Sequence, residues 1–183
     1  MKKFLIVLML FFASSSFAKT GFVKAKLQAS GLTCSMCSFA TEKSLLTLDF
    51  IDSVARDLDN TSFNLYFKKD KQVSLDQIKK KVQDAGFSVA VLIVTFNFEN
   101  VAISNDFHYD FEGSQYHFMN VKNQNLNGNV DITIIDRGFV SDKQFKKYGK
   151  MTHHECYASG TMKNCCNMHG GEGETRVYHV TLN

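Results

Sequence analysis

The sequence contains neither proline nor tryptophan among its 183 residues. Thioredoxin-like thiol–disulfide oxidoreductases complete their active site with a cis-proline, so the missing proline argues against that redox scaffold. Net charge is also nearly absent: it is +3, and it falls to +1 if Lys2 and Lys3 are removed with a leader. A chain with so little net charge has no broad basic field to bind nucleic acid or anionic lipid.

Motifs of the common catalytic sites are missing as well. The sequence has no G-x-S-x-G nucleophile elbow and no H-E-x-x-H metalloprotease motif. The glycine-rich stretch 170–173 lacks the lysine and the preceding strand that a phosphate-binding loop requires. The sequence therefore predicts a binding protein and not an enzyme.

The N-terminal residues have the pattern of a bacterial signal peptide. Two lysines precede the apolar run Phe4–Ala13, and Ser16-Phe17-Ala18 supplies small residues at a cleavage site. The alternative is a short membrane anchor, but the run is shorter than the about 20 apolar residues that span a bilayer. We expect residues 1–18 to be removed after Ala18 and the rest to be periplasmic or secreted.

Five cysteines remain in a chain expected to enter an oxidising compartment. Because the number is odd, at least one thiol is unpaired, bridges to another chain or binds a metal. The five fall into two groups, the pair Cys34 and Cys37 and the group Cys156, Cys165 and Cys166.

Residues 19–94 show the periodicity of a small α+β domain. Alternating apolar residues predict strands over 23–29, 51–58 and 63–67, and a further strand begins at Phe87. Helices are predicted from Met36 to about Leu48 and from the N-cap Ser74 to Gly86. The order is βαββαβ, which is the ferredoxin-like arrangement.

The stretch 21–93 resembles the heavy-metal-associated domain of copper chaperones, copper-pump N-terminal domains and the periplasmic mercury-binding protein. That family carries G-M-T-C-x-x-C, then E-x-x-L-x-x-L on the first helix and Gly-Tyr/Phe before the last strand. Leu32, Ser38, Thr41 and Phe50 depart from the family pattern without removing a ligand. The matching residues are Gly31, Thr33, Cys34, Cys37, Glu42, Leu45, Leu48, Val54, Gly86 and Phe87.

Four interpretations of Cys34 and Cys37 are open: a redox couple, a structural disulfide, half of a zinc site, or two thiolate ligands for a soft metal. A disulfide would close only a very small loop, where the entropic gain is least. No histidine or further cysteine lies between Gly21 and Asn100 to complete a tetrahedral zinc set. Soft Cu(I) accepts two thiolates, and a cysteine at a helix N-terminus gains thiolate character. The residues therefore favour soft-metal binding.

The resemblance implies that Cu(I) is the most fitting cargo, with Hg(II) or Zn(II) as alternatives. It also implies a metal donor or acceptor as partner, such as a metal-transporting ATPase or an efflux component. A periplasmic mercury-binding protein and a thiol–disulfide oxidoreductase are the alternative functions. An adaptor whose metal module regulates the second half is a third.

Residues 95–183 predict a small β-rich domain. Alternation at 96–98, 107–111 and 130–134, together with the segments 116–119 and 176–182, indicates about five strands. Ser141 or Asp142 caps a short helix that ends at Gly149. Asn127-Gly128 is a typical hairpin turn. We expect a twisted sheet or barrel that resembles an OB-fold.

The segment 151–174 is rich in cysteine and histidine. It predicts either a disulfide from Cys156 to Cys165 or Cys166, or a second metal site with Met162 and Met168 as optional soft ligands. The histidines outside this segment, at 108, 117 and 179, are interpreted as ordinary surface or packed side chains. The ligands of this second site are drawn from His153, His154, Cys156, Cys165, Cys166 and His169.

Overall fold

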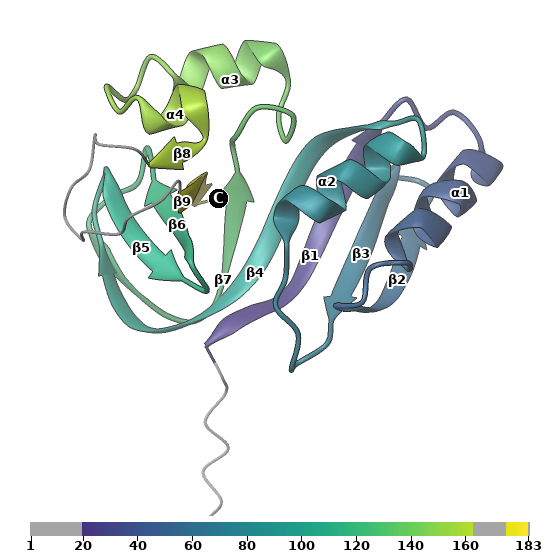
Figure 1. Ribbon diagram of the computed structural model, residues 1–183, viewed down its shortest axis with the longest axis horizontal. Coiled ribbons are helices and arrows are strands. Elements are labelled where there is room, and N and C mark those ends of the chain that lie inside the picture. The colour runs from purple at the N-terminus through teal and green to yellow at the C-terminus, as the bar shows by residue number, and fades with distance from the viewer. Residues whose placement is uncertain (1–19, 163–174, 183) are drawn as a thin grey trace, which may run out of the picture.

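The computed structural model describes residues 20–162 and 175–182. None of the four helices in these two ranges is long and apolar enough to cross a membrane. In chain order (Figure 1) the elements are β1 (Gly21–Ser30), α1 (Ser35–Leu45), β2 (Ile51–Asp57), β3 (Ser62–Phe67), α2 (Leu75–Asp84), β4 (Ser88–Ile103), β5 (Phe107–Phe111), β6 (Ser114–Phe118), β7 (Gln124–Ile134), α3 (Asp142–Tyr148), α4 (Cys156–Ser159), β8 (Thr161–Met162) and β9 (Thr175–Leu182).

The first half has the expected βαββαβ order, and its strands lie side by side as β2-β3-β1-β4. Helices α1 and α2 cover one face of this sheet (Figure 1). Leu27, Leu65 and Leu92 are fully buried in the sheet, and Leu45 and Ile78 are fully buried on the helices. The α+β class and the ferredoxin-like first half are confirmed.

Strand β4 belongs to both halves of the molecule. It pairs antiparallel with β1 from Ser88 to Asn97 and antiparallel with β7 from Ile93 to Ile103. Sixteen residues without a break therefore carry the chain across the boundary predicted at 94/95, as the absence of a linker suggests. Most buried apolar side chains of both halves form one continuous hydrophobic cluster, and a smaller second cluster contains Phe145 of α3 and Tyr157 of α4.

The second half continues the same sheet in the order β4-β7-β9-β6-β5, with β8 attached to β9. Strands β6 and β9 pair in parallel. Within the described ranges β5 forms a ladder with β6 alone, so the expected OB-like barrel is not confirmed. The sheet curls instead (Figure 1), and aromatic side chains of β5 pack on β4: the Phe96 and Phe111 rings lie 4.7 Å apart.

The hairpin predicted at Asn127-Gly128 is wrong, because β7 runs straight through these residues. Gly128 has φ +74° and pairs with Phe98, next to a register shift between Phe98 and Val101. Asn100, on the facing strand, also has a positive φ of 50°. The left-handed conformation that asparagine and glycine tolerate thus serves a β-bulge here and not a turn.

Candidate metal-binding sites

Cys34 and Cys37 lie where the loop after β1 enters α1. Cys34 is the N-cap of the helix, and its Sγ accepts a hydrogen bond from the backbone N–H of Cys37 at 3.2 Å. The carbonyl oxygen of Cys34 accepts the first helical hydrogen bond, from Ser38 at 3.2 Å. Gly31, with φ +89°, turns the chain from the strand into this loop. The capping geometry therefore fixes both sulfur-bearing residues on the first turn of one helix.

The two thiols are accessible to solvent, and the backbone at Cys37 is bonded to the buried side of the helix. Both thiols are free, Cys34 is exposed and Cys37 is partly exposed. Beneath them Thr41 is fully buried, and its hydroxyl donates to the carbonyl oxygen of Cys37 at 3.0 Å. Met36, between the two cysteines, is 70% exposed. A ligand from another protein can reach the sulfur atoms without any rearrangement of the core.

The environment favours the thiolate form of Cys34. A hydrogen bond with the Cys37 side chain lowers the pKa of Cys34, and the backbone N–H groups of Cys37 and Met36 lower it further. Soft-metal ions bind thiolates and not thiols. In the described part of the chain, neither cysteine joins a group of three or more metal ligands. The pair has the donor atoms and the exposure of an open two-thiolate site.

Because Cys37 is the main cause of the lowered pKa, Cys37→Ala should move the pH midpoint for Cys34 alkylation upward in metal-free protein. Labelling with iodoacetamide at several pH values, followed by mass spectrometry of the peptides, measures this midpoint. Ser35→Ala on the same turn is the control and should leave it in place. An unchanged midpoint in Cys37→Ala would show that the helix N-terminus alone activates Cys34.

The structure describes only His153, His154 and Cys156 among the six residues predicted for a second site. His153 is exposed, His154 is partly buried and Cys156, the first residue of α4, is fully buried. Cys165, Cys166 and His169 lie outside the described residues, and so do both partners of the predicted disulfide to Cys156. The cleavage site at Ala18 and the optional ligand Met168 also fall there, while Met162 lies in β8.

The structure gathers the histidines that sequence reasoning treated as ordinary. His108 on β5 pairs with His117 on β6, and His117 pairs with His179 on β9. The rings of His108 and His117 stack with centroids 4.2 Å apart, and the His117 and His179 centroids are 5.1 Å apart. His154 packs edge-on against His117 at 5.0 Å. His117 and His179 are packed as predicted, but the residues beside them are themselves able to bind a metal.

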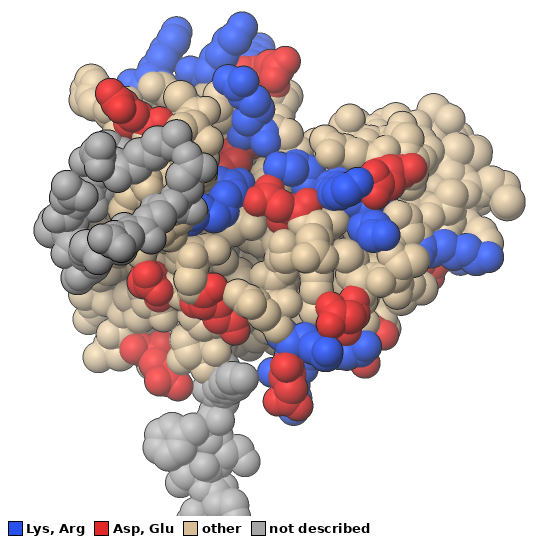
Figure 2. All heavy atoms as spheres, in the orientation of Figure 1, with Lys and Arg blue, Asp and Glu red and all other residues tan. Residues whose placement is uncertain are grey.

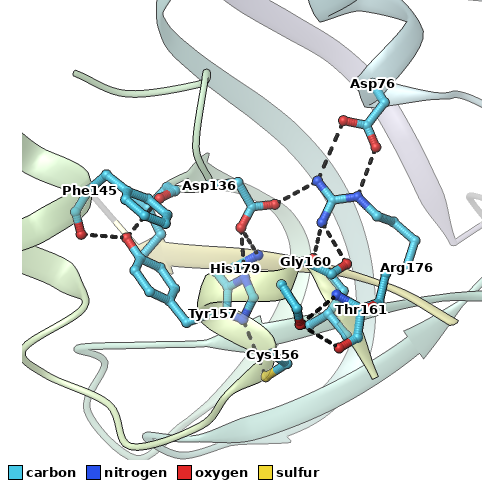
Figure 3. Close-up of polar contacts among 12 residues, drawn as sticks. Asp76, Asp136, Phe145, Cys156, Tyr157, Gly160, Thr161, Arg176 and His179 are labelled. Carbon is cyan, nitrogen blue, oxygen red and sulfur yellow. Dashed lines mark hydrogen bonds and ion pairs between the residues drawn. The ribbon is translucent and has the colours of Figure 1, made fainter. Parts of the chain in front are cut away.

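A chain of polar contacts extends from this cluster to the first half of the protein (Figure 3). Nε2 of His179 lies 3.5 Å from Sγ of Cys156, and its Nδ1 lies 2.6 Å from Asp136. The other carboxylate oxygen of Asp136 accepts from Arg176 at 2.8 Å, and Arg176 also donates to Asp76 of α2 at 2.8 Å. These ion pairs hold β9 against α2.

Burial lowers the pKa of two imidazoles of this cluster, those of His117 and His108. It lowers the pKa of His117 to about 2, and the neighbouring histidines lower it further. Burial and His154 likewise lower the pKa of His108. A signal in the sequence could have revealed the grouping, because each of the three strand histidines directly follows an aromatic residue: Phe107-His108, Tyr116-His117 and Tyr178-His179.

No protein-family model matches the chain, and no curated protein matches it. Several solved structures are similar to its N-terminal part. One is the CopZ metallochaperone, with 27% identity, a TM-score of 0.34, and coverage of 37% of this chain and 98% of that one. Another is the yeast copper transporter domain Ccc2a, with 24% identity, a TM-score of 0.33, and coverage of 37% and 90%. A third is the N-terminal domain of a potential copper-translocating P-type ATPase from Bacillus subtilis, with 21% identity, a TM-score of 0.34, and coverage of 39% and 85%.

Proposed function

We propose that this protein is an exported carrier that binds Cu(I) through Cys34 and Cys37 and passes it to a partner protein. The observation that carries the proposal is the pair of free, solvent-accessible thiols fixed on one helical turn, with Cys34 as the N-cap. Cu(I) prefers thiolate ligands and is stable with only two of them. The hydrogen bonds to Cys34 lower its pKa and so favour the thiolate that binds the ion.

Transfer by ligand exchange requires an underfilled site. A thiolate of the acceptor adds to the bound ion, and a thiolate of the donor then leaves. The ion thus passes from one protein to the other without entering solvent. Cys34 is exposed enough for an incoming thiolate to approach. A closed four-ligand zinc site would block this path, and the described residues around the pair offer no such set.

The surface beside the two cysteines suits a docking protein. Met36 and Phe39 on α1 and its C-cap residue Leu46 expose apolar side chains, by 70%, 37% and 46% respectively. Figure 2 shows a largely uncharged surface at the α1 end, whereas positive and negative groups intersperse over the neighbouring face. We infer a partner with a matching apolar rim around its own thiolates, such as a metal-transporting ATPase or an efflux component.

The test is anaerobic native mass spectrometry of the reduced chain with Cu(I), Hg(II) or Zn(II) added stepwise until binding is saturated. Cys34→Ser/Cys37→Ser should lose one equivalent of Cu(I), because serine oxygens are poor ligands for a soft ion. Ser35→Ala is the matched control and should retain it. Retention of all Cu(I) by the double serine variant would overturn the proposal, and so would insulin-reductase activity that depends on the pair.

The proposed export is tested separately. Protein recovered from the periplasm or the medium of a bacterial host should begin at Lys19, because cleavage is expected after Ala18. N-terminal sequencing reads this directly. Ala18→Arg should block cleavage and leave the protein with its first residues attached. Full-length protein found only in the cytoplasm would contradict export and leave the metal site untouched.

A further inference from the structure

Three histidines and one cysteine meet inside the second half of the protein. The ladders β5–β6 and β6–β9 place His108, His117 and His179 side by side on one face of the sheet. Cys156 comes from α4, and its Sγ faces His179 at 3.5 Å. His117, His179 and Cys156 are fully buried. Elements from distant parts of the sequence thus converge on one point.

His117 is oriented as a metal-binding histidine is. Its Nε2 lies 3.1 Å from a carboxylate oxygen of Asp106, which can only accept, so Nε2 carries the proton. Nδ1 is then the lone-pair nitrogen. It is buried and has no hydrogen-bond partner within residues 20–162 and 175–182. A carboxylate that fixes the tautomer while the other nitrogen stays available is the usual arrangement behind a metal ligand.

The ligand atoms are close enough for one ion. One nitrogen each of His108 and His117 and the sulfur of Cys156 all lie within 4.8 Å of one another. Bonds of about 2.0–2.1 Å to nitrogen and about 2.3 Å to sulfur put tetrahedral ligands about 3.3–3.7 Å apart. Side-chain shifts on the order of 1 Å would therefore close the three atoms around an ion, within the range of small χ rotations.

We propose that His108, His117 and Cys156 form a second metal site, for zinc or copper, inside the second half of the protein. Two imidazoles and one thiolate suit both metals, whereas magnesium and calcium require oxygen ligands. His154 and His179 adjoin the three ligands and can complete the coordination sphere. Asp136, 2.6 Å from Nδ1 of His179, aims the other nitrogen of that ring at the sulfur.

A neighbouring set competes for the same histidine. Asp106, His117 and His154 also bring their ligand atoms within 4.8 Å of one another. That set contains no sulfur, and it would use the carboxylate that now orients His117. The buried Nδ1 and the nearby Cys156 favour the set with the thiolate, and the two sets differ in a measurable way.

This site does not depend on the proposed function of Cys34 and Cys37. Helix α1, where Cys34 and Cys37 lie, and the elements β5, β6 and α4, which carry His108, His117 and Cys156, lie on opposite sides of the molecule (Figure 1). The exposed pair suits exchange with a partner, whereas a buried site retains its ion. The second site would therefore be occupied and stable even if the first never binds copper.

The experiment uses the full chain with Cys34→Ser/Cys37→Ser, reduced, with Zn(II) and Cu(I) added separately under anaerobic conditions. One equivalent should bind, and X-ray absorption at the edge of the bound metal should show one sulfur and two or more imidazole nitrogens. His108→Phe, which keeps the stacked ring, and Cys156→Ser should each weaken metal binding by at least about 100-fold. A residue that only supports a ligand from the outer sphere would cost less than this. His153→Ala changes an exposed neighbour and should leave affinity unchanged.

If the Cys156→Ser variant does not fold, the ligands counted by X-ray absorption in the Cys34→Ser/Cys37→Ser chain still decide the test. Failure of this reduced chain to bind either metal would overturn the proposal. A coordination sphere without sulfur would assign the metal to Asp106, His117 and His154 instead. Binding that survives His108→Phe but disappears in Cys165→Ser/Cys166→Ser would place the ion on segment 151–174 and also overturn it.

Discussion

Phe96→Ala should lower the free energy of unfolding by about 3–5 kcal/mol, the usual range for a buried phenylalanine. Phe96 is 1% exposed. Its ring lies 5.1 Å from that of Phe22, 4.5 Å from Phe98 and 4.7 Å from Phe111. The alanine leaves a cavity at the place where β4 pairs with β1 on one side and β7 on the other.

Urea unfolding followed by circular dichroism measures the loss. Because the cavity lies between the two halves, we also expect both halves to unfold together at the lower midpoint. Tyr66→Ala removes an aromatic side chain that is 44% exposed on β3, so it should cost well under half as much. A Phe96→Ala variant that unfolds as late as Tyr66→Ala would show that the shared strand is not what couples the halves.

Arg176→Met should cost about 2–4 kcal/mol, somewhat below the range for breaking a fully buried ion pair. The Arg176 side chain is 26% exposed, and it pairs with Asp136, which is 6% exposed, and with Asp76, which is 37% exposed. Methionine retains most of the aliphatic packing but leaves the Asp136 carboxylate buried with His179 as its remaining partner in Figure 3. The stability loss therefore comes mainly from an uncompensated charge.

The same interaction has a pH signature. Burial alone would raise the pKa of Asp76, but hydrogen bonds from Arg176 and Lys79 outweigh it and lower the pKa to about 2. A carboxylate with a lowered pKa stabilises the fold above its unfolded value of about 3.9 and loses that contribution as pH falls toward 2. The free energy of unfolding should thus fall more steeply between about pH 4 and about pH 2 in the parent chain than in Asp76→Asn.

Chemical denaturation at several pH values measures both effects. Lys80→Met is the matched control, because it removes an exposed i,i+4 pair with Asp84 whose side chains are 70% and 44% exposed. Such pairs contribute about 0.3–0.5 kcal/mol. Equal losses in Arg176→Met and Lys80→Met would mean that solvent screens the link between β9 and α2.

Local sequence signals determined most of the elements. Period-two alternation located β1, β3 and β5, and the caps Ser74 and Ser141 marked the starts of α2 and α3. Ser141 forms a capping box with Gln144, so the helix begins where its own side chains satisfy the backbone. The position of Cys34 and Cys37 on the first helical turn was predictable for the same reason, since the residues that define it are within four of one another.

Tertiary structure decided what those elements build. Asn127-Gly128 is compatible with a hairpin turn and with a bulge, and pairing of β7 along the whole second part of β4 selected the bulge. The sequence likewise offered no reason to place β9 in parallel beside β6, a pairing between strands far apart in the chain. That register brings His117 next to His179, and α4 then adds Cys156. A sequence fixes the phase of each strand by its own alternation, but the lateral order of strands follows from how a shared core is buried, so the histidine cluster becomes visible only in the folded protein.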